Sequence, residues 1–528
     1  MRTYKVLLVS FLATAALGLS SCVSDLDVTP IDPTLQLPGD VLDSEQAYYQ
    51  ILAKCYQGLA VSASDGQDSD PDIDGIDGGF GQYIRALFNL QCLTTDEALC
   101  VWNDDGLPDL NYGIWSSSNQ FISAMYYRIF FQIGLCNELI RQIGINPGNL
   151  TEADFPHKNQ FIAEARALRA LSYYHALDLF GNVPFSTEYD SVGSSGPVQI
   201  SRADLFAWVV NECQELLNGT DLAEAKQNIY GRCDKGMVRM ILAKLYLNAE
   251  TWIGEAKWSE CAALCRQVMQ DYPLHATYAD LFCADNHLWT ANTTYGGDEI
   301  IFVVEQDGIN IRSYGCTNFI IRAGGGSALN MKLGSDDLWG GLSLRKEFSE
   351  KFSDSDTRKI FNTEAGISID DPTIYSSTDA SVQCGYKSMK FTNINHDGSK
   401  ASDANFVDTD FPLFRAADAY LMLAECALHN AASQTDGQDA LNAVRKRAGL
   451  GSLTLTADNL LDERAREFYW ECTRRQDLIR FGKFTSGYNW QYKGGNKEGA
   501  DIAAYRNLFP LPPEDINANG NLTQNEGY

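Results

Sequence analysis

An arginine, a tryptophan and a carboxylate follow one another in the first fifth of the chain. Arg85, Trp102 and Asp105 lie in or beside predicted loops of the segment YIRALFNLQCLTTDEALCVWNDDGLPDL. The flat C–H face of a pyranose ring stacks on an indole, while charged or amide side chains hydrogen-bond to its hydroxyl groups. These residue types therefore favour a sugar-binding site. The alternative is structural, with Trp102 covering the core and Arg85 in an internal ion pair.

A loop rich in Gly and Asp precedes this segment. Asp70, Asp72, Asp74 and Gly75 match the opening of an EF-hand calcium loop. The twelfth position of such a loop needs a bidentate Glu, and here it is Gly81. We therefore interpret the segment as a solvated loop that shapes the rim of a pocket.

Signatures of catalysis are missing from the sequence. Glycoside hydrolysis needs two carboxylates across the scissile bond, and among 69 Asp and Glu residues a pair can always be found. No Ser/His/Asp, phosphate-loop or zinc-protease signature is present, and Cys261 and Cys265 lack a second pair of zinc ligands. We expect a binding protein and no enzyme. A glycoside hydrolase, and a peptide-binding or scaffolding protein of helical repeats, are the alternatives.

The longest helical signal runs through QFIAEARALRALSYYHALDLFGNVPF, residues 160–185. Its apolar residues recur at steps of three and four over more than one narrow face, which is typical of a buried helix. The alanines among them let a second helix approach closely, as stacked helical hairpins require. Gly181 and Pro184 should end this helix.

Further helices and an irregular region complete the expected fold. A helix over 47–59 is predicted, with two helical hairpins: DKGMVRMILAKLYLNAETW, capped by Asp234, with the helix around Cys261, and RAADAYLMLAECALHNA with DALNAVRKRAGL. One further helix is predicted through LLDERAREFYWECTRRQDLIRFGKF, with Leu461, Ala465, Phe468 and Cys472 on its packed face. Residues 285–411 are rich in Gly, Asn, Asp and Ser, with short strands expected at 300–304 and 319–321. The fold class is therefore mainly α: tetratricopeptide-like helical hairpins packed against a long irregular region with a few short strands. Such an irregular insert is where binding surfaces are usually built.

The N-terminus has the features of a lipoprotein export signal. Arg2 and Lys5 precede an apolar run too short to span a bilayer, and small residues lead to Cys22. Cys22 is predicted to become the acylated first residue of the mature chain; an ordinary signal peptide with an incidental cysteine is the alternative. Residues 1–21 are then the signal peptide, 22–40 a lipidated tail and linker, and 41–528 the binding domain.

The net charge argues against one class of partner, and the cysteines are interpreted as part of the core. The formal net charge of −28 repels nucleic acid, whereas an uncharged glycan is indifferent to it. Most of the 14 cysteines lie among apolar residues, so we interpret them as small buried hydrophobes.

Several segments together resemble the SusD/RagB family of outer-membrane lipoproteins that capture glycans. EARALRALSYYHALDLFGNVPF, SDLDVTP, ERAREFYWECTRRQDLIRFG and the C-terminal LFPLPPEDINANGNLTQNEGY carry the resemblance over almost the whole mature chain. It implies a SusD-like fold and a surface-exposed protein that is lipid-anchored in the cell outer membrane. The implied partners are starch or malto-oligosaccharide and a SusC-like TonB-dependent transporter. Another neutral glycan or a peptide is the alternative ligand, since the fold alone does not choose it.

The resemblance to starch-binding members also implies a site. Cys100 stands where those members have an aromatic residue, and Asp105 where they have Asn. The resemblance implies that the rings of Trp102, Tyr314 and Trp339 form an arc, which would match the helical curve of an α-linked glucan. The six implied glycan-binding residues are Asp77, Arg85, Trp102, Asp105, Tyr314 and Trp339.

A structural calcium ion is a further implication of the resemblance. Asp408 and Asp410 align with calcium-binding carboxylates, and Pro412 just beyond is consistent with a non-helical segment that turns both toward one cation. His287 and an insertion occupy the region where a further ligand would be expected. A solvated pair of aspartates is the alternative.

Overall fold

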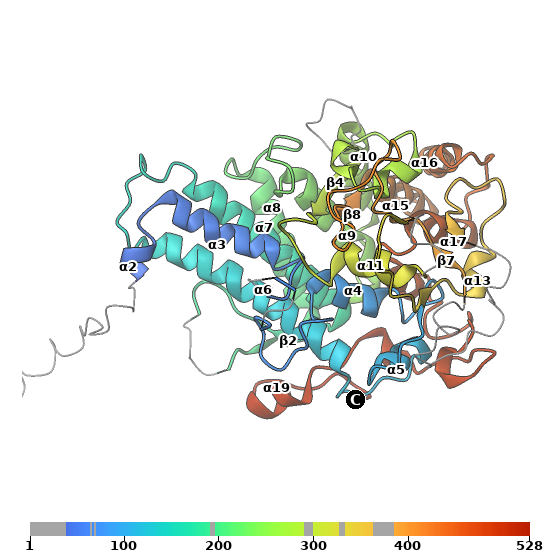
Figure 1. The fold of residues 1–528 in the computed structure, drawn as a ribbon, viewed down its shortest axis with the longest axis horizontal. Helices are drawn as coiled ribbons and strands as arrows, with labels where there is room; N and C mark the ends of the chain where they lie inside the picture. The colour runs from blue at the N-terminus through green and yellow to red at the C-terminus, as the bar shows by residue number, and fades with distance from the viewer. Residues whose placement is uncertain are drawn as a thin grey trace, which may run out of the picture.

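The protein is mainly helical, with four short two-stranded sheets in the part of the chain that the structure describes (Figure 1). This confirms the predicted mainly α fold class with a few short strands. The sequence signal at Cys22 lies outside the described residues. The structure is a computed structural model, which describes residues 38–63, 66–67, 70–190, 196–289, 299–326, 333–362 and 385–528.

Helices from the first half of the chain pack one against the next. In Figure 1, α3, α6, α7 and α8 form the left side of the molecule, and along the chain α6 packs on α7, α7 on α8, α8 on α9 and α9 on α10. α7 is the most enclosed of them, because nearly every residue from Phe161 on is buried. The bounds are α3 (Glu45–Gln57), α6 (Gln120–Ile145), α7 (Lys158–Leu179), α8 (Arg202–Asn218), α9 (Lys235–Ile253) and α10 (Trp258–Asp271).

The predicted ends of two of these helices are confirmed. α7 stops at Leu179, and Gly181 follows with a φ of 74°, in the left-handed conformation that glycine favours. α9 begins behind Asp234, whose carboxylate accepts hydrogen bonds from Gly236 N and Met237 N.

The C-terminal helices differ from the prediction at one point. α15 packs on α16, as expected for a hairpin, and α17 also packs on α15. The predicted continuous helix through Cys472 is broken in two. Trp470 and Cys472 have φ values of 64° and 61°, which no right-handed helix accommodates. The bounds are α15 (Ala416–Leu428), α16 (Gln434–Arg447), α17 (Ala457–Phe468) and α18 (Arg474–Arg480).

Buried cations explain why the helix is interrupted. Lys390 Nζ donates to the carbonyl of Tyr469 at 2.6 Å, and Arg415 Nη2 donates to the carbonyl of Glu467 at 3.3 Å. In a continuous helix these carbonyls would be used within the helix itself. The break therefore supplies acceptors to positive charges in the core, where water cannot.

The irregular insert contains one predicted strand and one helix in place of a strand. β4 (Ile300–Val304) is confirmed and pairs antiparallel with β8 (Phe411–Arg415). The expected strand at 319–321 is wrong, because these residues lie in α11 (Cys316–Gly324), all nine residues of which are buried. A short apolar run that is enclosed on every side carries no periodicity that separates a helix from a strand. α11 packs on α4 (Tyr83–Gln91).

The remaining elements are short. None of the helices in the described ranges is long and apolar enough to cross a membrane. The other strand pairs are antiparallel: β1 (Leu99–Cys100) with β5 (Leu342–Ser343), β2 (Val183–Pro184) with β3 (Gln199–Ile200), and β6 (Phe361–Asn362) with β7 (Lys387–Ser388). The short helices are α2 (Pro38–Val41), α5 (Leu107–Tyr112), α13 (Lys346–Ser349) and α19 (Pro513–Ala518).

Ion pairs fill the interior where the insert meets the C-terminal helices. Arg415 reaches Glu299 at 2.5 Å, Glu467 at 3.0 Å and Glu471 at 2.7 Å, and all four side chains are buried. Burial favours the protonated form of Glu467, but the guanidinium groups around it, those of Arg447 and Arg415 foremost, hold its pKa well below the ordinary range. We call these residues, together with Arg358 and Lys390, the buried ion network.

Candidate functional site

Three of the predicted residues form a continuous row of aromatic rings. The ring centroids of Trp102 and Trp339 are 6.4 Å apart, and those of Trp339 and Tyr314 are 5.7 Å apart. Phe406 extends the row, 6.0 Å from Tyr314. The two tryptophans and Tyr314 are half-buried, so each keeps part of its ring open to solvent, while Phe406 is buried. We call Trp102, Trp339 and Tyr314 the aromatic row.

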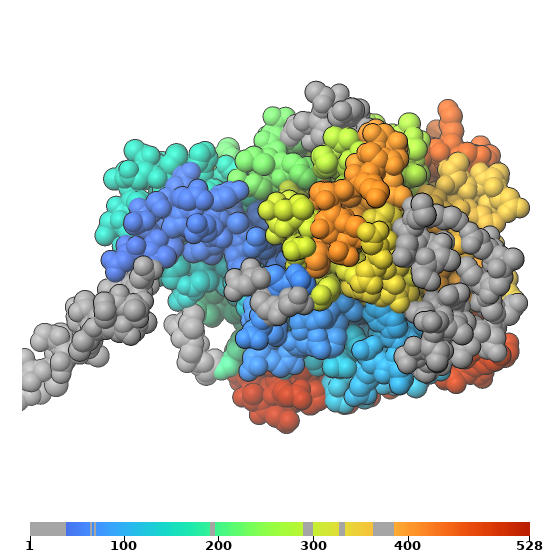
Figure 2. Space-filling view, in the orientation of Figure 1, coloured from blue at the N-terminus to red at the C-terminus, as the bar shows by residue number. Residues whose placement is uncertain are grey.

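A short strand pair brings the two tryptophans together. β1 and β5 align Cys100 opposite Leu342, and Val101 N donates to the carbonyl of Gly341 at 2.9 Å. Gly341 has a φ of 98°, and a Cβ atom there would lie 2.2 Å from Trp102 Nε1. Only glycine therefore allows the indole of Trp102 to lie against this backbone. In Figure 2 the blue, yellow and orange segments that carry the row meet near the centre of the face shown.

Arg322 supports Trp339 from the side of the protein. Its guanidinium carbon lies 4.3 Å from the centroid of the Trp339 ring, and its own carbonyl accepts from Trp339 N at 2.7 Å. The guanidinium is fixed by the carbonyls of Asp337 at 2.8 Å and Asn405 at 2.9 Å, and by the Asp337 carboxylate. Sequence reasoning missed Arg322, and only its place in the apolar run of α11 could have drawn notice to it.

Arg85 adds a positive charge beside the row. It lies in the first turn of α4, and its Nη1 donates to the carbonyls of Gly79 and, at 3.0 Å, of Tyr314. Its guanidinium carbon is 4.2 Å from the Phe319 centroid and 5.8 Å from that of Trp102. The internal ion pair considered as an alternative is not formed with any described residue, and Nε is buried without a hydrogen-bond partner. Burial lowers the pKa of Arg85 to about 10, so it remains charged at neutral pH.

The two predicted aspartates lie at different distances from this centre. Asp77 accepts from Gly79 N at 2.6 Å, and the Gly79 carbonyl in turn receives Arg85. Asp105 is exposed and lies near Asp109, whose pKa is raised by burial and then by the Asp105 carboxylate. The structure thus brings Asp77 and Arg85 together with the aromatic row and leaves Asp105 beside the start of α5. Asp104, which sequence reasoning missed, acts on the charge of Arg85.

Aromatic faces flanked by carboxylates, and by a guanidinium that forms no ion pair with a described residue, can hold a ring that has apolar faces and a polar edge. The sequence profile that describes the SusD family matches residues 330–528. The chain is also 33% identical to Starch-binding protein SusD of Bacteroides thetaiotaomicron, and the match covers 98% of each chain. The protein belongs to the SusD family.

Solved structures with a SusD-like fold are similar over most of their length. Surface glycan-binding protein A from Bacteroides thetaiotaomicron, in complex with laminarihexaose, has a TM-score of 0.68 at 20% identity, covering 91% of this chain and 99% of that one. A SusD-like carbohydrate binding protein from Bacteroides fragilis has a TM-score of 0.69 at 20% identity, covering 92% and 100%. At this level of identity the likeness shows the fold alone.

The two aspartates predicted to bind calcium in this SusD family member accept hydrogen bonds from the protein itself. Asp408 accepts from Gly308 N at 2.9 Å and from Ser402 N at 2.6 Å, while Asp410 accepts from Gln306 N at 2.7 Å and from the hydroxyl of Tyr230. Within the described ranges no group of three or more His, Cys, Asp or Glu side chains is arranged to hold a metal ion. The ion stays a prediction, checked by metal analysis of the purified protein and by melting with and without a chelator.

The Asp-rich loop and the cysteines have structural roles. Asp72 pairs with Lys54 at 3.2 Å and with the buried Arg128 at 2.9 Å, which ties the loop to α3 and α6. The interpretation of most cysteines as buried hydrophobes is confirmed, since Cys472 alone among the described cysteines is partly exposed.

Proposed function

We propose that this protein binds starch or malto-oligosaccharide along the aromatic row. The observation that carries the proposal is the row itself: three half-buried rings in sequence, beside an arginine whose charge no described carboxylate pairs with. A sugar covers a ring face with its C–H groups, and Arg85 and Asp77 supply hydrogen-bonding partners for the hydroxyl groups.

The inclination of the rings supports a curved ligand. The planes of Trp102 and Trp339 meet at 53°, and those of Trp339 and Tyr314 at 69°. The row therefore turns along its length, and successive sugars of an α-linked glucan follow such a turn without being bent first. A flat β-linked chain would contact fewer rings and would lose conformational freedom on binding. The name of the relative, Starch-binding protein SusD, agrees with this choice.

Titration of the intact protein with three glycans of similar size tests the ligand. A cyclic α-glucan should bind at least tenfold more tightly than a cello-oligosaccharide, and laminarihexaose is included because Surface glycan-binding protein A is in complex with it. We expect Trp102→Ala to weaken binding of the cyclic glucan at least tenfold, since a stacking aromatic contributes on the order of 1–3 kcal/mol and 1.4 kcal/mol is a factor of ten.

The control is Trp208→Ala, which removes a half-buried tryptophan on α8 that packs edge-to-face against Tyr173 and Phe185. It should leave glycan binding unchanged. Equal binding of the α- and β-linked ligands would refute the starch proposal, and full binding by a Trp102→Ala, Trp339→Ala double variant would remove the aromatic row from the site. Release of reducing sugar from a bound polymer on long incubation would show that the protein is an enzyme.

The same proposal places the protein on the outer membrane, anchored through an acylated Cys22, where it delivers glycan to a SusC-like TonB-dependent transporter. The export signal and the membership of the SusD family support this. Cys22→Ala should give a folded protein that leaves the membrane fraction in a strain without the transporter. Retention there would contradict the anchor, and failure of the pair to co-purify from detergent would contradict the partner.

A further inference from the structure

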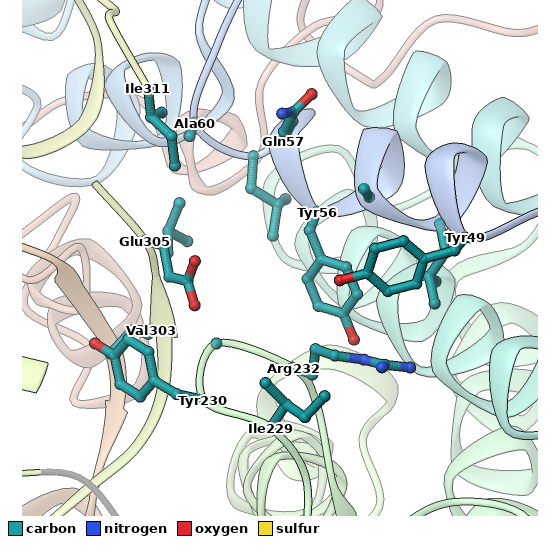
Figure 3. A pocket seen from close by; sticks show the side chains of 15 residues that line it. Tyr49, Tyr56, Gln57, Ala60, Ile229, Tyr230, Arg232, Val303, Glu305 and Ile311 are labelled. Carbon is teal, nitrogen blue, oxygen red and sulfur yellow. The ribbon is translucent and has the colours of Figure 1, made fainter. Parts of the chain in front are cut away.

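A pocket of about 310 Å³, apart from the aromatic row, lies between α3, the loop 229–232 and the end of β4 (Figure 3). Its apolar walls include Leu52, Val303 and Ile311. The rings of Tyr49 and Tyr56 stand on one side of the space, and Glu305 points into it from the other. The pocket therefore combines apolar walls, aromatic rings and one carboxylate.

The other charged groups of this pocket are already neutralised. Arg232 donates from Nε to Glu164 at 2.8 Å and from Nη2 to its second oxygen at 2.5 Å. Its guanidinium carbon also lies 5.8 Å from the Tyr49 ring centroid. The hydroxyl of Tyr56 donates to Glu164 at 2.6 Å and accepts from Cys233 N at 3.0 Å. Neither Arg232 nor Glu164 leaves a net charge for a ligand.

Glu305 is the exception. This half-buried carboxylate receives no hydrogen bond and no ion pair from any residue within the described ranges. The backbone makes room for it: Gly231 has a φ of 76°, and a Cβ atom there would lie 1.7 Å from Glu305 Oε1. Asp307, two residues further on, adds a second negative charge nearby. A carboxylate withdrawn from water without a partner is costly, so a matching cation would be bound favourably.

We propose that this pocket binds a positively charged amine or guanidinium group carried on a short apolar stem, with Glu305 pairing the charge and the rings of Tyr49 and Tyr56 contacting the stem and the cation. A cation is attracted by the aromatic faces as well as by the carboxylate. A neutral sugar could only donate hydroxyl hydrogens and would leave the charge of Glu305 uncompensated. The net charge of −28 draws cations toward the molecule in general.

The site is separate from the aromatic row, although one segment borders both. Ser313 Oγ donates to the carbonyl of Ala60 at 2.9 Å, and Ala60 lines the pocket, whereas the next residue, Tyr314, belongs to the row. The two sites take different ligands, a cation and a neutral glycan. Failure of one proposal therefore leaves the other standing.

Ligand-observed NMR with the intact protein tests the proposal. The probes are agmatine, the blocked amino acid N-acetyl-arginine amide, and N-acetyl-norleucine amide as a neutral control. Both charged probes should bind and the neutral one should bind at least fivefold more weakly. Glu305→Gln should lower affinity for the charged probes at least fivefold, and Tyr49→Leu should lower it as well, since Tyr49 is 39% exposed and can be replaced without opening the core.

Glu255→Gln is the matched control, because it removes the same charge from a side chain that is 68% exposed and does not line the pocket. It should change nothing. Binding of agmatine and the blocked arginine alike supports the proposal for cations in general, and binding of the blocked arginine alone supports it for a side chain of a polypeptide. Equal binding of charged and neutral probes, undiminished binding by Glu305→Gln, or no binding of either charged probe would overturn it.

Discussion

Arg322 holds the ring of Trp339 from the side of the protein. The guanidinium stacks on the ring at 4.3 Å while three acceptors fix its orientation. A row of rings binds well only if the rings are in place before the ligand arrives, since ordering them on binding costs free energy. Arg322 is therefore a positioning residue for the proposed glycan site.

Arg322→Lys should weaken binding of the cyclic α-glucan about fivefold, because lysine cannot bridge the carbonyls of Asp337 and Asn405 or lie flat on the indole. Quenching of tryptophan fluorescence by acrylamide should increase in the free variant, which a loss of contact with the glycan alone would not cause. Arg312→Lys is the control, since Arg312 stacks on Phe406 at 4.8 Å but its side chain is 47% exposed. Identical quenching and affinity in Arg322→Lys would exclude the positioning role.

Glu97 predicts a pH dependence of stability. Burial raises its pKa to about 8, above the ordinary value of 4.5. The folded protein thus keeps a proton that the unfolded chain releases above about pH 4.5, so this group lowers the free energy of unfolding as the pH rises from about 4.5 to about 8. Glu97→Gln keeps an acceptor for Trp470 N and does not titrate. Its melting temperature should gain on that of the wild type between pH 5 and 8, and parallel curves would show that Glu97 is charged in the core.

Among the elements, helix ends followed from local chemistry. The Asp234 cap and the stop at Gly181 were predicted because each depends on residues adjacent in sequence. The break between α17 and α18 depends on Lys390 and Arg415, which lie far away in sequence, and so it was beyond prediction. The same holds for the site. Its residue types indicated a sugar ligand, and the family resemblance indicated which residues belong to it. The contact of Arg322 with Trp339 and the pocket around Glu305 arise only from tertiary packing, so the sequence could not show them.

Removal of the cap on α9 should destabilise the protein. Asp234→Ala loses acceptors for the N–H groups of Gly236, Met237 and Lys226 and should lower the free energy of unfolding by about 1–2 kcal/mol. Asp234→Asn keeps a capping oxygen and should lose less than half of that. Chemical denaturation of the three proteins measures the difference. Equal losses for Ala and Asn would assign the effect to the charge of Asp234 and not to capping.

At the scale of the whole molecule, the buried ion network joins distant parts of the chain. Glu467 on α17 contacts Arg415, Arg447 and Arg358, of which Arg358 precedes β6 and Arg415 ends β8. Glu467→Gln removes one negative charge from among three cations in a dry interior. We expect the free energy of unfolding to fall by roughly 3–5 kcal/mol, as for a buried pair that loses one partner.

Asp354→Asn provides the control for this prediction. Asp354 pairs with Lys359 at 2.6 Å, but its side chain is 98% exposed, and water replaces the partner. Urea denaturation should show no measurable change for Asp354→Asn and a large decrease for Glu467→Gln. A small effect of Glu467→Gln would mean that water or rearranged carboxylates compensate the three arginines.

The buried ion network should also destabilise misfolded forms of the protein. The charge of Arg415 is fully paired only when Glu299, Glu467 and Glu471 are all in place. Glu299 immediately precedes β4, Glu467 lies in α17, and Glu471 lies in the break between α17 and α18. A chain that pairs the wrong helices strands an unmatched charge away from water, which costs more than the correct pairing gains. Half-assembled forms are thereby kept scarce. The segments that supply these four side chains should accordingly unfold together and not one after another.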